Sequence, residues 1–346
     1  MMLFRNAVLS DLEGIYALAQ RCGIGITTLS KDKVCLEERL RAVDESFKKI
    51  DVATPTSEYY LFVLEDPSSG RLVGTSGIEA SVGYELPFYS YKISHQTRLS
   101  RALGIRRDYD TLNLVNDYQG SSELCTLFLS PDFRRLHHGL LLSRARFLFM
   151  AAFPSRFSSR VIAEMRGVSD NWGESPFWNN VGKHFFQMSF AEADHLTLLT
   201  DKQFISDLMP RHPIYVPLLS EEAQAAIGQP HASTVSALKI LEREGFQYKR
   251  YVDIFDAGPT IEVSFDHIRT IAQTKPARIA DIATEVAGEL YLVAHGSASN
   301  FRATLASIAG VNVDEASETQ TIVIDRQTAT LLQVQINDVI RLSVFA

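Results

Sequence analysis

The sequence predicts an α+β fold, with a mixed sheet flanked by helices and a small β-rich module at the C-terminal end. Three observations carry this prediction: apolar runs of strand length alternate with helical patterns, turn residues separate them, and the composition changes after residue 263. We expect a first region at 1–263, with a core at 1–166 and a second half at 167–263, followed by the module at 264–346.

Composition and charge exclude several classes of protein. Hydrophobic residues make up 46% of the chain, so a full core can be buried, and the net charge of −7 offers no basic field to nucleic acid. The three cysteines lie far apart, so we expect neither disulfides nor a metal site. No apolar run reaches the roughly 18 residues that span a bilayer, and the charged N-terminal turns do not resemble a signal peptide. No membrane partner and a cytoplasmic location are therefore expected.

The first third of the chain predicts a strand, two helices and a hairpin. Ser10 and Asp11 precede apolar residues at helical spacing and are the expected N-cap of the first helix. Aromatic and polar residues at 84–118 indicate an irregular insertion with some strand. The expected strands are 3–5, 59–64 and 72–78, joined by a turn at 66–70, and the second helix is 32–49.

A strand, a basic loop and a long helix follow one another directly at 122–153. The apolar run 122–129 is typical of a buried strand, and 140–153 runs without a helix breaker up to Pro154. Between them, Arg134 and Arg135 precede Gly139. Backbone N–H groups at a helix N-terminus bind anions, and arginines add charge-assisted contacts to phosphate. The unit therefore predicts a phosphate-bearing ligand, with a solvated charge pair as the alternative for the two arginines.

Later segments give two weaker patterns. Two segments share the order helix, glycine, aromatic residues and predicted strand: one begins at Pro176 and contains Gly182, and the other covers 234–244 and is followed by Gly245. This indicates either a partial internal duplication or the chance recurrence of a common local arrangement. Beyond residue 288, β-branched strands separated by turns predict a barrel-like module. The strands expected are 160–166, 251–255, 291–293, 321–324 and 339–344.

The order of elements resembles the core of acyl-CoA-dependent N-acyltransferases of the GNAT type, and Arg134 and Gly139 fit the ends of that fold's phosphate loop pattern. Longer strings resemble the arginine N-succinyltransferase family across roughly residues 1–271. These strings are 123–129 (ELCTLFL), 163–167 (AEMRG), 175–178 (SPFW), 208–215 (LMPRHPIY) and 251–259 (YVDIFDAGP).

The resemblance implies transfer of succinyl from succinyl-CoA to the α-amino group of L-arginine, the first step of a bacterial route of arginine catabolism. It leaves two alternatives open: an acyltransferase that prefers ornithine, or a non-catalytic partner subunit of a heteromeric enzyme. A homo-oligomer or a pairing with a paralogous subunit is also consistent with it.

The resemblance also implies roles for single residues. The succinyl-CoA contact on the central strand falls on Leu127, and the catalytic proton donor falls on His231. A histidine titrates near the working pH and can serve proton transfer to or from the reacting groups. Without the resemblance, Leu127 is a core residue and His231 a solvated loop residue. Arg134, Arg135 and Gly139 are the remaining expected cofactor contacts.

The substrates themselves require charged partners. A guanidinium needs carboxylate partners, and Glu164 is favoured for this role. Burying a carboxylate inside a strand costs free energy unless the group binds a partner. Asp170, Glu174 and Asp194 are the other candidates. Arg166 is a candidate for the succinyl carboxylate, with a salt bridge between Glu164 and Arg166 as the alternative for both.

His137 is where the chain departs from the family, which has glycine at this loop position. Glycine permits positive φ and a close backbone approach, and histidine tolerates left-handed geometry better than β-branched residues do. We therefore expect either a shifted mode of CoA binding or a weakened site.

Overall fold

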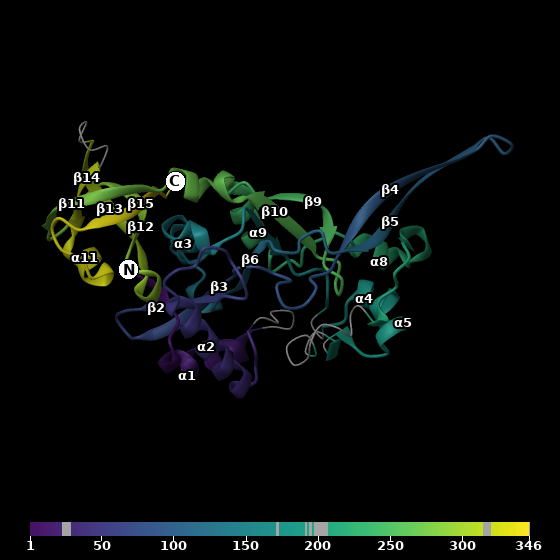
Figure 1. The fold of residues 1–346 in the computed structure, drawn as a ribbon, viewed down its shortest axis with the longest axis horizontal. Helices are drawn as coiled ribbons and strands as arrows, with labels where there is room; N and C mark the ends of the chain where they lie inside the picture. The colour runs from purple at the N-terminus through teal and green to yellow at the C-terminus, as the bar shows by residue number, and fades with distance from the viewer. Residues whose placement is uncertain are drawn as a thin grey trace.

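The computed structural model describes residues 1–22, 29–170, 173–190, 192–193, 196, 207–313 and 320–345. Figure 1 shows an elongated molecule, with a ring of strands at one end, a helix-covered sheet in the middle and a hairpin projecting from the other end. Among the described residues, hydrogen-bonded pairs join fifteen strands into one continuous series. No helix in the described ranges is long and apolar enough to cross a membrane.

The middle of the molecule is a mixed sheet in the order β1-β2-β3-β6-β7-β10-β9. Helix α1 packs on β3, α2 on β2, and α3 on both β3 and β6. The strands are β1 (Leu3–Asn6), β2 (Tyr59–Asp66), β3 (Arg71–Glu79), β6 (Ser122–Leu129), β7 (Arg160–Glu164), β9 (Gln247–Val252) and β10 (Pro259–Ser264). The helices are α1 (Leu12–Arg21), α2 (Lys33–Lys48), α3 (His138–Ala152), α9 (Val235–Arg243) and α10 (Arg269–Gln273).

An aromatic cluster fills the core beneath this sheet. The Phe62 ring lies 4.7 Å from that of Phe4 and 5.0 Å from that of Phe149 on α3. Phe301, from far along the chain, meets Phe149 at 5.2 Å. The first pair is stacked and the other two are edge-to-face, and both arrangements add attraction to the large buried area, so the cluster fixes α3 against the sheet.

The two N-terminal helices begin differently from each other. Asp32 caps α2 as its position suggests, accepting the N–H groups of Val34 at 2.8 Å and Cys35 at 3.0 Å. Asp11 stands at the N-cap position of α1, after a 3-10 turn at Leu9–Asp11, but no side chain caps the helix. The carboxylate of Asp11 instead forms an ion pair with Arg5 at 2.7 Å and accepts the N–H of Val8 at 2.9 Å. The expected side-chain cap is absent because these two partners engage the carboxylate.

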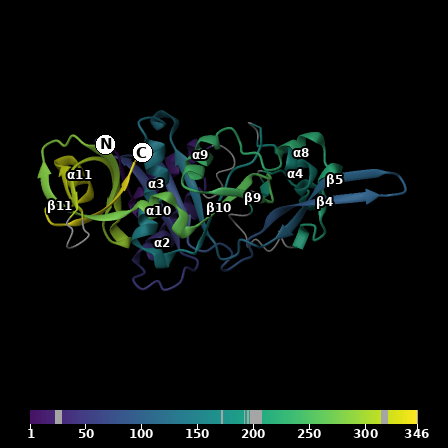
Figure 2. The same cartoon turned by 90° about the horizontal axis from the view of Figure 1, so that it is seen from above.

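Residues 84–118 are more regular than the sequence indicated. They contain two antiparallel strands of eleven residues each, β4 (Ser90–Ser100) and β5 (Ile105–Val115), which project from the body in both views (Figures 1 and 2). The base of the hairpin pairs with β9 and with β8 (Ile214–Tyr215). Both faces of the projecting part meet solvent, so the alternation of apolar and polar residues that marks a half-buried strand is absent.

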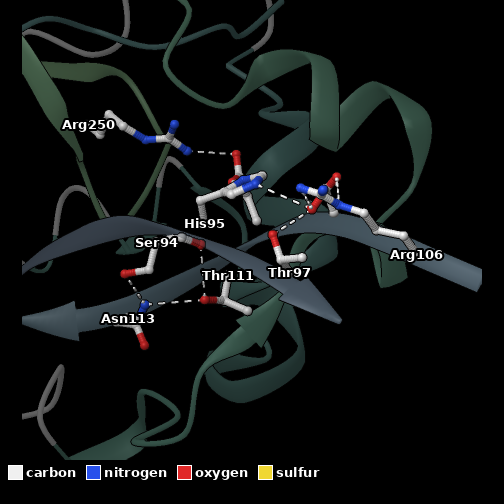
Figure 3. Close-up of polar contacts among 9 residues, drawn as sticks. Ser94, His95, Thr97, Arg106, Thr111, Asn113 and Arg250 are labelled. Carbon is white, nitrogen blue, oxygen red and sulfur yellow. Dashed lines mark hydrogen bonds and ion pairs between the residues drawn. The ribbon is translucent and has the colours of Figure 1, made fainter. Parts of the chain in front are cut away.

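Polar side chains hold this hairpin together and tie it to β9, as Figure 3 shows. Asp110 on β5 accepts a hydrogen bond from Arg250 at 2.8 Å and lies 3.1 Å from Nδ1 of His95 on β4. Thr97 donates across the strands to Asp108 at 2.6 Å. These cross-strand contacts replace the apolar packing that usually supports a strand pair.

The two segments that suggested an internal repeat have different structures. Gly245 follows α9 with φ +104°, and the buried Phe246 donates its N–H back to Leu241, as expected for a helix C-terminus. Gly182 instead begins a helix, and a Cβ there would lie 2.2 Å from the Trp178 ring, so packing requires the glycine. The next strand after it in the described residues is β8, at Ile214–Tyr215. The helices of this region are α4 (Pro176–Asn180), α5 (Gly182–Phe186) and α8 (Glu221–Ala226).

The C-terminal strands close into a ring around their own aliphatic core (Figure 2). Their order is β12-β15-β11-β14-β13, and β12 also pairs with β13. A second edge of β13 pairs with β1, where Phe4 lies opposite Ala303, so the ring is joined to the main sheet. The elements are β11 (Lys275–Ala283), β12 (Glu289–His295), β13 (Arg302–Val313), β14 (Gln320–Asp325), α11 (Arg326–Leu332) and β15 (Val339–Val344).

Candidate active site

A gap between β6 and β7 forms the site. These two strands are parallel, but they pair only at Ser122 with Val161 and at Glu123 with Ile162. Beyond that point, the β7 side of β6 has no partner in the ladder, and both strands line a cavity of about 500 Å³. The start of α9 and the segment after β9 complete its wall. Unpaired strand edges bind extended ligands through main-chain hydrogen bonds.

The central strand β6 is bulged where it faces this cavity. Thr126 has φ +54°, and the register with β3 shifts between Thr75 and Gly77. The Thr75 hydroxyl donates to the carbonyl of Thr126 at 3.0 Å, which holds the bulge from behind. Bulges re-aim neighbouring backbone groups and occur next to active sites. Leu127, the residue after the bulge, is half-buried and lines the cavity.

The basic loop adopts the left-handed geometry that the sequence required of His137. Leu136 and His137 have φ values of +50° and +66°. The imidazole of His137 lies edge-on to Phe345, with ring centroids 5.2 Å apart. Gly139 is not demanded by packing, since an added Cβ would meet its nearest neighbour, Leu129, only at 3.8 Å. A ligand that approaches the backbone closely remains a reason for glycine there.

The structure brings only part of the predicted phosphate set to the cavity. Arg134 lines it, and its Nε donates to the carbonyl of Leu129 at the end of β6. Arg135 is exposed and, like Gly139, lies outside the cavity lining. Arg21 at the end of α1 also lines the cavity and pairs with Asp132 at 2.7 Å. Sequence reasoning missed Arg21, which has no local signal.

His231 reaches the cavity because its segment docks on the end of β7. Pro230 forms an isolated bridge with Gly167, and the N–H of His231 donates to the carbonyl of Arg166 at 2.7 Å. The half-buried imidazole lines the cavity. Burial, followed by the charge of Arg166, lowers the pKa of His231 from its usual value, which favours the neutral ring.

Ser233 sets the tautomer of that neutral ring. Its backbone N–H donates to Nδ1 of His231 at 3.1 Å, and its hydroxyl lies 2.7 Å from the same atom. A ring nitrogen that accepts from a backbone N–H carries no proton, so we assign the proton of neutral His231 to Nε2. The arrangement therefore presents an N–H donor at Nε2.

Acidic side chains gather on one wall of the cavity. Glu164 at the end of β7 lines it and accepts from the Thr260 hydroxyl at 3.4 Å. Asp253 and Asp256 line it too, although sequence reasoning did not single them out. Asp256 is buried and accepts the N–H groups of Gly167 at 2.7 Å and Gly258 at 2.8 Å. Burial, followed by the nearby charge of Asp253, raises the pKa of Asp256 well above its usual value.

Of the other residues predicted to bind substrate, one lines the cavity and two lie outside its lining. Arg166 lines the cavity and donates to the Ser169 hydroxyl at 2.6 Å. Asp170 and Glu174 are exposed and lie outside the cavity lining, where Asp170 accepts the N–H of Glu174. Asp194 lies outside the described residues. The signal that would have found Asp253 and Asp256 is their spacing around a turn that ends in Gly258, where a Cβ would lie 2.0 Å from the carbonyl of Met165.

A bulged strand beside an unpaired parallel neighbour, with a basic loop at a helix start, is the arrangement expected of an acyltransferase that takes a thioester. The family model described as arginine N-succinyltransferase beta subunit matches residues 2–270, and the model of that subunit's C-terminal domain matches 273–343. The chain belongs to the arginine N-succinyltransferase family.

Individual relatives agree with this assignment. The chain is 46% identical to the arginine N-succinyltransferase of Photorhabdus laumondii over 89% of this chain and 90% of that protein. It is 44% identical to the enzyme of that name from Yersinia enterocolitica over 88% of each chain. Its structure superposes on subunit AI of the arginine/ornithine succinyltransferase from Pseudomonas aeruginosa with a TM-score of 0.87 and 36% identity, covering 100% of this chain and 99% of the other.

Proposed function

We propose that the protein transfers the succinyl group of succinyl-CoA to the α-amino group of L-arginine, as the first step of an arginine-degrading route. The observation that carries the proposal is that one cavity holds the bulged strand at Leu127, the imidazole of His231 and the carboxylate of Glu164. These three parts supply a place for a thioester, a proton donor and a partner for a guanidinium. Membership of the family supports the choice of substrates.

Succinyl-CoA enters along β6. Its amide-bearing pantetheine arm pairs with the free edge of the strand near Leu127, as an added strand would. Its pyrophosphate meets the N-terminal turn of α3, where Gly139 permits close approach and Arg134 and Arg135 supply charge. The imidazole of His137, turned towards Phe345, leaves this approach to the loop backbone.

The reaction is a direct attack of the amine on the thioester. Arginine first loses a proton from its α-ammonium group; its nitrogen then bonds to the carbonyl carbon, and backbone N–H groups at the bulge stabilise the oxyanion. The first proton released by the amine makes His231 an imidazolium. The C–S bond breaks as the nitrogen gives up its second proton to solvent, and the departing thiolate receives the proton on Nε2 of that imidazolium. The ring is then neutral again and returns to the Nε2–H tautomer by proton exchange with solvent.

The guanidinium of arginine binds the acidic wall. Glu164 is half-buried at the end of β7, on the wall that also holds Asp253 and Asp256. A planar guanidinium binds carboxylates through paired N–H donors, and a partly buried site strengthens such contacts relative to water. Asp256 contributes chiefly by fixing the backbone at Gly167 and Gly258, since both of its oxygens already accept N–H groups.

Thiol release from succinyl-CoA by the purified chain tests the proposal. We expect turnover with L-arginine as the sole acceptor, and a kcat/KM for L-ornithine below that for arginine. A preference for ornithine would favour the second acceptor in the name of the Pseudomonas aeruginosa relative. Turnover only after a paralogous chain is added would favour a partner subunit, an alternative consistent with the word subunit in the names of the family model and of that relative.

We further propose that the chain is built as two units, residues 1–263 and 264–346. The closed ring and its separate aliphatic core support this division, although α10 packs on α3 of the first unit. Limited proteolysis of the full chain tests it: cleavage should concentrate between residues 264 and 274, before β11 begins, whereas first cuts inside the ring strands would contradict it.

A further inference from the structure

Helix α3 buries two arginines, two residues apart, in different surroundings. Arg144 is 5% exposed and forms an ion pair with Glu244 at 2.9 Å. The Nε atom of this ion pair also donates to the Thr270 hydroxyl at 3.0 Å, and an N–H of Nη1 donates to the carbonyl of Phe345 at 2.8 Å. Its charge is therefore neutralised by a carboxylate within the protein.

Arg146 is 1% exposed and has only neutral partners. Its guanidinium donates to the carbonyl and hydroxyl of Ser143 at 3.0 and 3.2 Å and to the carbonyl of Gly77 at 3.4 Å. No acidic side chain in the described ranges forms an ion pair with it. Burial lowers the pKa of Arg146 to about 10, which reflects a charge held away from water without a counter-ion. A buried charge of this kind is costly unless something pairs with it.

A third buried arginine shows how such a charge can be compensated without an acid. Arg156 donates to the carbonyls of Ser46 and Lys49 at the C-terminal end of α2, and to the Tyr60 hydroxyl. The partial negative charge of a helix C-terminus stabilises a cation there. Arg156 also lies outside the cavity lining. Arg146 donates to no helix C-terminus of this kind and does line the cavity, so it differs from Arg156 in both respects.

The position of Arg146 identifies what would pair with it. It lines the cavity beside Cys125 and Thr126, at the bulge of β6, and donates to Gly77 on the neighbouring strand. A thioester whose carbonyl is held at the bulge directs its acyl chain into this part of the cavity. We propose that the guanidinium of Arg146 binds the distal carboxylate of the acyl group and so selects dicarboxylic acyl-CoA donors; this rests on the proposed function.

Of the other cavity arginines, Arg21 is paired with Asp132 at 2.7 Å, and the remaining two are placed for different tasks. Arg134 is anchored to Leu129 at the end of β6 that meets the basic loop, where the phosphates are expected. Arg166 follows β7, its carbonyl accepts the N–H of His231 and its charge acts on that imidazole, so it lies on the proton-transfer side of the cavity. Arg146 is the buried cation behind the bulge. A site that holds an unpaired buried cation strongly rejects an acyl chain that brings no anion.

Calorimetric titration with succinyl-CoA and with butyryl-CoA, which has four acyl carbons and no carboxylate, tests the inference. We expect the wild-type chain to bind succinyl-CoA at least about 10-fold more tightly, and Arg146→Gln to abolish that preference. In turnover with arginine, the kcat/KM ratio of the two donors should fall by at least about 10²-fold in the variant. Equal binding of both donors by the wild type, or an unchanged ratio in the variant, would overturn the inference.

Arg144→Gln is the matched control on the same helix. Because it breaks a buried ion pair away from the cavity, it should lower the melting temperature and leave the donor ratio unchanged. Collapse of the ratio in Arg166→Gln but not in Arg146→Gln would assign the carboxylate to Arg166 and overturn the inference. If Arg146→Gln does not fold, Arg146→Met is titrated instead, since it removes the charge and keeps an unbranched side chain; it should lose the preference, and a retained preference would overturn the role.

The two proposals fail in different ways. A wild-type chain that binds succinyl-CoA in preference to butyryl-CoA but does not acylate arginine would remove the proposed acceptor and keep the role of Arg146. A chain that acylates arginine equally well from both donors would keep arginine as the acceptor and remove the role of Arg146.

Discussion

The ring of β11–β15 and the gap between β6 and β7 are both built from strands, but they enclose different things. The ring closes through pairing of β12 with β13, and buried side chains such as Ile279, Val293 and Ile322 form its core. The gap exists because the β6–β7 ladder stops after two pairs. Its walls carry arginines, acids and a histidine among apolar residues such as Leu124 and Leu127. Completed pairing gives a stable core, whereas interrupted pairing leaves room and main-chain groups for a ligand.

Among the variants that separate the gap from the ring, His231→Ala should have the largest effect on turnover. The variant removes the proton donor, so we expect kcat for succinyl transfer to fall by about 10² or more, with little change in melting temperature because the ring is only half-buried. Steady-state thiol release measures it. His184→Ala, an exposed histidine on α5, is the matched control and should retain normal turnover. Near-normal kcat in His231→Ala would remove the catalytic assignment.

Arg134→Ala should give the next largest effect. Loss of a charge-assisted phosphate contact should raise KM for succinyl-CoA about 10-fold while kcat changes little. Arg135→Ala, which alters an exposed neighbour outside the cavity lining, should raise KM less. Equal KM values for the two variants would show that Arg134 and Arg135 contribute equally to binding of succinyl-CoA.

Ile322→Val alters the ring of β11–β15 and leaves the gap between β6 and β7 unchanged. Ile322 is fully buried in the aliphatic core, so deleting one methyl group should lower the free energy of unfolding by about 1 kcal/mol. Denaturant titration gives this value. Because the ring holds no part of the cavity lining, kcat/KM below the melting temperature should be unchanged, and a large loss of activity would contradict the separation of the two regions.

The pH behaviour of His231 should produce a smaller effect. Its pKa is lowered on folding, so between the two pKa values the folded chain binds fewer protons than the unfolded chain. The contribution of His231 to the free energy of unfolding is therefore fully present above the unfolded pKa and is lost as the pH falls towards the folded pKa. NMR titration of the imidazole should give a pKa below about 6.5. Arg166→Gln should raise that pKa, since it removes a repelling charge. An unchanged or lower pKa in that variant would contradict the electrostatic argument.

His137→Gly should have the smallest effect. The residue already has the left-handed backbone that glycine prefers, and its ring lies against Phe345. We expect activity to be retained and binding of CoA to be equal or tighter by calorimetry. A large loss of affinity would show that the imidazole itself contacts the ligand.

Sequence reasoning succeeded where local rules operate. It placed the strand at 122–129, the second helix at 32–49 and the helix end at Gly245, each of which depends on neighbouring residues. It failed for Asp11, whose carboxylate found a tertiary partner, and for the hairpin at 84–118, whose exposed faces carry no apolar alternation. Of the site, it named Leu127, Arg134, Glu164, Arg166 and His231, all of which line one cavity.

The sequence by itself determined the α+β class, the strand–loop–helix unit and the family, because these depend on local backbone preferences and on matching strings. The tertiary structure alone decided that His231 docks on the carbonyl of Arg166, and that Arg144 has a carboxylate partner while Arg146 does not. The reason is physical: a charge is neutralised or left unpaired by residues distant in the chain, and only folding brings those residues together.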